Sequence, residues 1–422
     1  ARPLLKSMTG VCRHFGAAGS KQQNRRKIIM RVLALGGAGD MGRTAVTTLV
    51  NSPAIKAITV ADYNIALAEK FVGLSESDKL AAVKIDATDK SALLDLMAGH
   101  DIVMSTIGPY YKFGPLITGA CIEAKKSCVD ICDDWKPMMD VLEMDEAAKK
   151  SGITIIPGIG ASPGISNLLA AYAAADFDEV DEIVTAWGNG KYVSGSPQPH
   201  HVSKKVLGVT DDQNAAIMHL LHESTATIPT YKNGEFVHID ALTEASPLRF
   251  PGFKEMPAYH IGHPEPLTIP RSIRANTVSN VMYYGKPFME LLAKIAGQIK
   301  KGELSIEKAA FKFNTEAMKL AVVPETVEFP APICVIVTGV KDGMKMKTGL
   351  ALTHIPYGHM AGSTGVPLAI AAMMLATGRI DKKGVITPEA AIDPAYFLES
   401  YASYCGEGLE VKDVLLKKTE NI

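Results

Sequence analysis

The sequence has little of several features that would assign a protein to a class at once. It contains no run of about eighteen consecutive apolar residues, the length that a helix needs to cross a bilayer. Its formal net charge of -1 gives no reason to expect nucleic acid or an anionic membrane as a partner. Its six cysteines lack the density and spacing of a secreted disulfide scaffold. These absences favour a cytoplasmic protein with reduced thiols and a small-molecule ligand.

Two further shortages concern metal sites and targeting. Cys128 and Cys132 are four residues apart, but no second cysteine pair or nearby histidine completes a zinc site, so we expect no bound metal. Residues 1–29 contain no Asp or Glu and are rich in Arg and Lys. Such a basic leader is typical of an organellar transit segment, of an upstream extension or of an expression tag, and we leave it out of the fold prediction.

From Met30 onward, short aliphatic runs alternate with helical stretches. This alternation repeats six times over about 130 residues, which predicts an α/β fold with a Rossmann-type, doubly wound parallel sheet. Among its helices we expect one over residues 114–124 and one over residues 138–150. The runs that would form strands are continuously apolar, as buried parallel strands require.

The pattern changes after residue 160. Residues 161–355 contain many prolines and hairpin-like pieces, with good turns at Asn233-Gly234 and Asp342-Gly343. They predict a second α+β domain with a largely antiparallel sheet, which would bind substrate and form a homodimer. Residues 356–422 are helical again, and we expect them to return to the first domain, which would then comprise residues 30–160 and 356–422.

The first chemical motif is a glycine pattern between an expected strand and helix. Gly37, Gly39 and Gly42 enclose Asp40 and Met41 in a GxGxxG sequence. In a dinucleotide site the first glycine permits a tight turn, the second lets the backbone approach the diphosphate, and the third allows close helix packing. The helix N-terminus then offers free N–H groups to the anion. This context predicts a dinucleotide cradle.

Three charged residues bear on the choice of cofactor. Asp62 ends the next strand, where a carboxylate accepts hydrogen bonds from a ribose and repels a 2′-phosphate, so we expect NAD, with NADP as the alternative. Arg43 could contact the diphosphate or a 2′-phosphate. Asp86 could approach the adenine or cap the helix that begins near Lys90.

Ligands of open α/β sheets bind beyond the carboxyl ends of the strands. That rule directs attention to the segment from Gly108 and Pro109 to Tyr110 and Tyr111, where either tyrosine could form a wall of the nicotinamide site. It also selects residues 130–134 and 157–164.

Four segments resemble signatures of the saccharopine dehydrogenase-like oxidoreductases: "GGAGDMGR", "STIGPYYKFGPLITGACIEA", "CVDICDD" and "PGIGASPGISNLLA". The resemblance implies cofactor contacts at Gly37, Gly39, Gly42 and Asp62, with backbone contacts at Gly108 and Pro109. It also matches Asp130 to a family aspartate and Asp134 to a position that is often acidic. Lys126, Ser127 and Cys128 replace the glycine-rich approach found in many relatives.

The resemblance further implies hydride transfer between a nicotinamide and a carbon that bears nitrogen, on an amino-acid or opine-type substrate. Proton transfer calls for a titratable group, and a carboxylate calls for arginine. The candidate catalytic residues are Asp133, Asp134, His201 and Lys204, with His200 as a neighbour. The candidate substrate-binding residues are Tyr110, Arg249 and Arg271, with Arg274 as a neighbour. A carboxynorspermidine-type polyamine dehydrogenase and a non-catalytic NAD-binding regulator remain alternatives.

Overall fold

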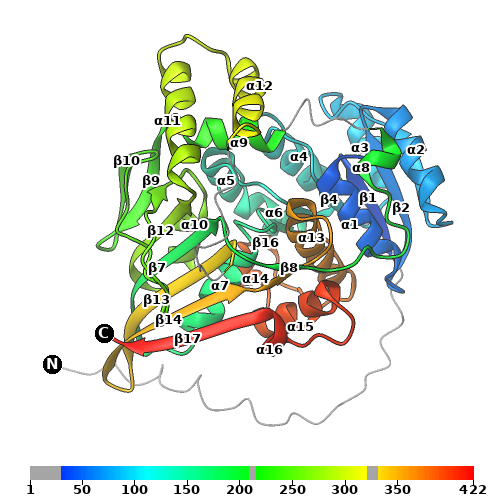
Figure 1. Cartoon of the computed structure of the whole chain (residues 1–422). Coiled ribbons are helices and arrows are strands. Elements are labelled where there is room, and N and C mark those ends of the chain that lie inside the picture. Colours follow the sequence, from blue (N-terminus) through cyan, green and yellow to red (C-terminus); the bar gives the residue numbers. More distant parts are fainter. Residues whose placement is uncertain (1–29, 209–214, 321–330) are drawn as a thin grey trace, which may run out of the picture.

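A computed structural model describes residues 30–208, 215–320 and 331–422. Its first sheet is entirely parallel, with strand order β16-β6-β5-β4-β1-β2-β3 (Figure 1). The strands are β1 (Met30–Leu35), β2 (Ile55–Asp62), β3 (Leu80–Lys84), β4 (Ile102–Ser105), β5 (Ser127–Asp130), β6 (Thr154–Ile156) and β16 (Gly384–Val385). Their order reverses at β1, as in a doubly wound fold, which confirms the predicted Rossmann-type sheet.

Helices cover both faces of this sheet, and β1 shows why. Val32 and Ala34 belong to one buried cluster, whereas Leu33 and Leu35 belong to another. The first cluster contains side chains of α1 (Asp40–Val50), α2 (Ile65–Ser75), α7 (Ile165–Ala174) and α13 (Met360–Ala376). The second contains side chains of α3 (Lys90–Ala98), α4 (Tyr110–Ala124), α5 (Trp135–Leu142) and α6 (Asp145–Ser151). A strand buried on both sides must be apolar throughout.

Two helices differ from their predicted bounds. α4 begins at Tyr110 instead of residue 114, because Pro109 takes the N-cap position with an extended backbone and the following residues are free to become helical. The segment expected as one helix over residues 138–150 is two helices, α5 and α6, with Glu143 and Met144 between them.

The second sheet has strand order β10-β9-β12-β7-β13-β14-β17, with β11 (Tyr259–His260) paired to β12. The strands are β7 (Glu179–Gly188), β9 (Thr227–Lys232), β10 (Glu235–Asp240), β12 (Ala275–Tyr283), β13 (Ile333–Lys341), β14 (Met344–Leu352) and β17 (Leu415–Asn421). Only β12 and β7 run parallel along this path. The sheet is therefore largely antiparallel, as predicted.

Both predicted hairpin turns are present. Asn233 and Gly234 have φ values of 53° and 81° between β9 and β10, and Asp342 and Gly343 have values of 50° and 75° between β13 and β14. Two consecutive positive φ values define the tight turn whose twist matches that of the strands it joins.

The remaining helices surround the space between the two sheets. α9 (Ala215–Glu223), α11 (Lys286–Lys300) and α12 (Ile306–Ala317) pack together above the second sheet, and α8 (Lys204–Leu207) lies beside α2 (Figure 1). α10 (Glu265–Thr268) and a 3-10 turn at Ile269–Arg271 lead into β12. None of the helices in the described ranges has the length and hydropathy of a membrane span.

The C-terminal part of the chain contributes elements to both sheets. α13 packs on α1, and β16 pairs with β6, so this part returns to the first sheet as expected. α14 (Pro388–Ala391), α15 (Pro394–Cys405) and α16 (Val411–Val414) then lead to β17. β17 pairs with β14 of the second sheet along seven residue pairs, from Met346 to Leu352. The expected assignment of all of residues 356–422 to the first domain is therefore wrong at its end, because β14 offers an open edge whose backbone groups β17 satisfies.

Candidate active site

The glycine motif forms a tight turn between β1 and α1. A Cβ atom on Gly42 would lie 2.3 Å from the Gly36 carbonyl oxygen and 2.8 Å from Gly37 Cα, so only glycine allows this approach. A Cβ on Gly39 would meet only the Gly36 oxygen, at 3.3 Å, which leaves its other sides open. α1 begins at Asp40 with no side-chain cap, and the first N–H groups of a helix have no intrahelical partner. The turn therefore fits the diphosphate of a dinucleotide.

Asp62 lies beside this turn, at the end of β2. Its Oδ2 accepts a hydrogen bond from the Ala38 N–H at 3.2 Å, and its Oδ1 accepts one from the Asn64 N–H at 3.0 Å. Burial raises the pKa of Asp62, although both backbone bonds oppose that shift. These bonds fix the carboxylate beside the glycine turn, and its contact with a ribose remains a prediction.

Arg43 stabilises the glycine turn. It is 5% exposed, its Nη1 donates to the Ala38 carbonyl oxygen at 2.6 Å, and its Nη2 pairs with Asp40. A guanidinium occupied in this way does not reach out to a 2′-phosphate.

Asp86 does not cap α3. The N-cap is Asp89, which accepts the Ala92 N–H at 3.1 Å. Asp86 instead accepts hydrogen bonds from the Thr88 N–H and hydroxyl, at 2.9 and 2.6 Å, and these bonds lower its pKa. The contact with adenine remains a prediction.

Tyr110 and Tyr111 begin α4 directly after Gly108 and Pro109. Tyr110 is 4% exposed, and its hydroxyl donates to the Ser105 carbonyl oxygen at 3.2 Å. Burial raises its pKa well above the usual value. Tyr110 thus joins the ends of β4 and β5 and keeps its hydroxyl away from a substrate. Tyr111 is 42% exposed, so it is the tyrosine available to a ligand.

The end of β5 positions a pair of carboxylates. Asp130 is buried and accepts the N–H groups of Cys132 and Gly158, at 2.8 and 3.0 Å, while burial raises its pKa to about 6. The loop anchored in this way carries Asp133 and Asp134 toward α9, where they meet a histidine and a glutamate. We call Asp133, Asp134, His219 and Glu223 the acidic cluster.

Ion pairs hold the acidic cluster together. His219 Nδ1 lies 3.0 Å from Asp133 Oδ1 and 3.3 Å from Asp134 Oδ2, and His222 Nδ1 lies 3.1 Å from Asp134 Oδ1. Burial alone would lower the pKa of His219, but the two aspartates raise it to about 11. Burial alone would raise the pKa of Asp134, but the two histidines lower it to about 2.

Glu223 joins this cluster to a second buried group. It is 2% exposed, and its Oε2 lies 3.3 Å from His263 Nε2, while its Oε1 has no hydrogen-bond partner within the described ranges. Burial raises the pKa of Glu223 to about 8, against the opposing charge of His263. His263 stacks on Trp187 with ring centroids 5.1 Å apart.

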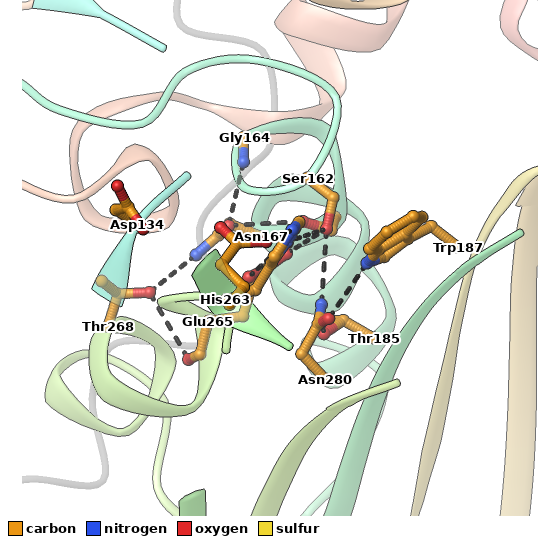
Figure 2. Close-up of polar contacts among 12 residues, drawn as sticks. Asp134, Ser162, Gly164, Asn167, Thr185, Trp187, His263, Glu265, Thr268 and Asn280 are labelled. Carbon is orange, nitrogen blue, oxygen red and sulfur yellow. Dashed lines mark hydrogen bonds and ion pairs between the residues drawn. The ribbon is translucent and has the colours of Figure 1, made fainter. Parts of the chain in front are cut away.

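Figure 2 shows the polar network behind His263. Ser162 contacts His263 Nδ1 at 3.2 Å and donates to Glu265, which also accepts from Ser166 at 2.7 Å. Asn280 links Ser162 to the Trp187 indole, at 3.3 and 3.1 Å. Because most of these buried groups have partners, the network fixes the orientation of His263 and Trp187.

Some of these groups line a cavity of about 620 Å³ between the two sheets. Met41 of the glycine turn forms part of its wall, so the cavity reaches the cofactor site. Its polar wall comprises Asp133, Ser162, Glu223, His263 and His359, and its aromatic wall comprises Trp187, Tyr192, Tyr284, Phe288 and Phe313. In the described part of the chain, no arginine or lysine lines this cavity.

Several predicted site residues lie elsewhere. Arg249 pairs with Glu255 at 2.8 Å and is 62% exposed in its side chain, and Arg271 is exposed and donates to the Leu267 carbonyl oxygen. Lys204 pairs with Asp40 at the start of α1, and the His201 ring packs 5.0 Å from Tyr357. The structure therefore does not bring these four residues to the cavity, since the loops that carry them follow other surfaces.

Four residues of this site, His219, Glu223, His263 and Glu265, were not predicted from the sequence. One signal was present: His219 and Glu223 are four apart, the spacing that places two side chains on the same face of a helix. Donor atoms of Asp133, His219 and Glu223 all lie within 4.8 Å of one another, so the acidic cluster has room for a small cation, whether an ammonium group or a metal ion.

This geometry defines a class of protein: a two-domain oxidoreductase with a dinucleotide-binding turn and a cavity at the domain boundary. Two family profiles match the chain: the saccharopine dehydrogenase NADP binding domain over residues 32–156 and the saccharopine dehydrogenase C-terminal domain over residues 160–407. The chain belongs to the saccharopine dehydrogenase family, and it is an NAD(P)-dependent oxidoreductase.

Similar proteins carry related names. A carboxynorspermidine synthase of Vibrio alginolyticus is 24% identical over 89% of this chain and 95% of its own length. A saccharopine dehydrogenase [NADP(+), L-glutamate-forming] of Pyricularia oryzae is 30% identical over 51% of this chain and 46% of its own. The solved apo saccharopine dehydrogenase (L-Glu forming) of Saccharomyces cerevisiae shares the fold, with a TM-score of 0.60, 18% identity, and coverage of 93% of this chain and 100% of that one.

Proposed function

We propose that this oxidoreductase acts on the carbon–nitrogen bond of a cationic amine, of the carboxylated polyamine class. The main support for this substrate class is the charge of the side chains that line the cavity. The partly buried carboxyl group of Asp133 and the buried one of Glu223 face it, whereas no arginine or lysine of the described residues does. An opine with several carboxylates would need basic partners, and a polyamine needs acidic ones.

The aromatic wall suits the rest of such a substrate. Trp187, Tyr284, Phe288 and Phe313 offer ring faces and apolar area to an aliphatic chain that carries ammonium groups. The full-length similarity to a carboxynorspermidine synthase supports this assignment. The saccharopine dehydrogenases are similar over about half of the chain, and they support the amino-acid alternative.

For the cofactor we infer contacts at the sequence-predicted residues. These are Gly37, Gly39, Asp40, Met41, Gly42, Asp62, Asp86, Gly108 and Pro109. The position of Asp62, with its carboxylate fixed beside the glycine turn, supports NAD over NADP. When bound, the nicotinamide exchanges a hydride with the substrate carbon.

The chain's own residues then have to manage a proton at the substrate nitrogen. A protonated amine has no lone pair to assist departure of a hydride from the neighbouring carbon, so its proton must leave first. Asp133 faces the cavity and can accept it, as can Glu223 in its ionised form, while Asp134 holds His219 and His222 in place. In the reductive direction the same groups return the proton.

The test is a substrate panel followed through nicotinamide absorbance. We expect the value of kcat/KM for a carboxylated polyamine to exceed that for saccharopine or lysine by about 100-fold. A preference for saccharopine would instead support the amino-acid function. Tight binding of NADH with no turnover of any amine would support a regulatory role.

We also infer a homodimer in the cytoplasm, as the sequence predicted. β10 lies at the edge of the second sheet and carries Phe236, which is 51% exposed. An open edge of this kind is a natural contact between copies. Light scattering of the purified protein should give twice the mass of the chain, and a single-chain mass would contradict the dimer.

A further inference from the structure

A segment that follows β7 crosses back onto the cofactor-binding edge of the first sheet. It pairs through β8 (Val193–Ser194) with β15 (His354–Ile355) and continues to α8, which lies beside α2 (Figure 1). We call residues 195–208 the crossing segment. Its His201 and Lys204 are candidate catalytic residues from the sequence, but in the structure Lys204 lies at the N-terminus of α1.

The crossing segment is anchored on both sides of Lys204. Val202 and Leu207 are 5% and 4% exposed, in the same buried cluster as side chains of α1 and α2. The His200 ring bonds to the Ser75 carbonyl oxygen at 2.7 Å, and Lys70 donates to the Leu207 carbonyl oxygen at 2.9 Å. Lys204 therefore has a defined position.

That position is at the first residue of α1. Lys204 Nζ pairs with one carboxylate oxygen of Asp40, and Arg43 pairs with the other. Both cations therefore lie at the N-terminus of α1, an end of the helix that favours anions. The Lys204 side chain is 42% exposed, so its ammonium group can also meet a ligand from solvent.

We propose that the crossing segment forms the second wall of the diphosphate site, and that Lys204 donates to the phosphate oxygens of the bound dinucleotide. The glycine turn contacts the diphosphate from one side through backbone N–H groups, and Lys204 contacts it from the other. Because the crossing segment leaves the second sheet, the cofactor is held between both domains. This inference depends on dinucleotide binding and not on the identity of the amine.

The experiment compares Lys204→Met with the matched control Lys205→Met, whose exposed lysine is the next residue. ADP-ribose, ADP and adenosine are titrated calorimetrically, without any amine. Lys204→Met should weaken ADP-ribose and ADP by about tenfold and leave adenosine unchanged, because only the first two carry a diphosphate. Lys205→Met should bind all three ligands normally, and Lys204→Arg should keep most of the affinity.

Two results would overturn the proposal. One is an unchanged affinity of Lys204→Met for ADP-ribose, or an equal loss for adenosine. The other is unchanged ADP-ribose binding with a fall in kcat at saturating cofactor, which would return Lys204 to proton transfer. A failure of the amine assignment would leave the titrations intact, so the two proposals fail separately.

Discussion

Glu223 Oε2 lies 3.3 Å from His263 Nε2, and the two residues are 2% and 6% exposed. Each belongs to a different part of the second domain, and both face the cavity together with Asp133. The other carboxylate oxygen of Glu223 has no partner among the described residues. An unpaired buried oxygen is costly, so the cavity favours a ligand that donates to it.

Glu223→Gln tests this relationship. At pH 9, where Glu223 is ionised, we expect the affinity for a cationic amine to fall by about tenfold to 100-fold, because the substitution removes the charge and keeps the shape. The binding constant follows from quenching of Trp187 fluorescence. Glu290→Gln, on the exposed side of α11, is the control and should bind normally. Equal affinities of the two variants would remove Glu223 from the amine site.

The pH dependence of amine binding follows from the same carboxyl group. Burial raises the pKa of Glu223 to about 8, so the group is mostly protonated at pH 7 and ionises above it. A cationic amine prefers the ionised form, and its affinity should rise between about pH 7 and 9. In Glu223→Gln the affinity should stay flat across that range, and a persistent rise would assign the titration to another group.

Gly42→Ala tests the cofactor turn. The added Cβ would lie 2.3 Å from the Gly36 carbonyl oxygen, so the turn has to open. We expect loss of detectable NADH binding and a fall in the free energy of unfolding of about 2–4 kcal/mol. Gly119→Ala in α4 is a matched control, because its Cβ meets nothing within 4 Å and alanine favours helix by about 0.5–1 kcal/mol. Normal NADH affinity in Gly42→Ala would contradict the assigned cradle.

Asp62→Ala tests the choice of cofactor. The native protein should bind NADH more tightly than NADPH, because the carboxylate accepts ribose hydroxyls and repels a 2′-phosphate. The substitution should weaken NADH by about tenfold and reduce the preference between the two. Calorimetry with each nucleotide measures both effects. Tighter NADPH binding by the native protein would show that Asp62 does not select the cofactor.

Asp130→Asn tests whether ionisation of the buried Asp130 carboxyl group lowers the free energy of unfolding. The folded pKa of Asp130 is about 6, above the usual 3.8, so the folded state holds the proton more tightly. The free energy of unfolding should therefore fall as pH rises from about 4 to 6 and then level off, by about 3 kcal/mol at most. Both N–H donors reach the same oxygen, Oδ1, so asparagine can keep them.

The measurement for Asp130→Asn is denaturant unfolding at several pH values. The variant should lose the contribution to the pH slope between about pH 4 and 6 that the native protein shows. It should be more stable than the native protein at pH 7. A parallel slope in both proteins would mean that the carboxyl titrates normally.

Local features of the sequence determined the first sheet, both hairpins and the cofactor turn. Apolar runs with intervening helical stretches specify a parallel sheet, and pairs such as Asn233-Gly234 specify turns through their own backbone preferences. The fit of Gly42 beneath the Gly36 carbonyl is likewise encoded within a few residues. The carboxyl-end rule also selected the loop that places Asp133 at the cavity, because β5 ends just before it.

Only the tertiary structure determined which side chains contact the carboxylates that follow β5. His219, Glu223 and His263 are far from Asp133 in the chain, and their convergence depends on how α9 and the segment before α10 are placed against the loop that follows β5. The same holds for Lys204, whose side chain lies at the start of α1 and not in the cavity, and for β17, which joins the second sheet. Spacing along a chain fixes local geometry, whereas contacts between distant segments depend on burial and backbone pairing that the whole fold satisfies at once.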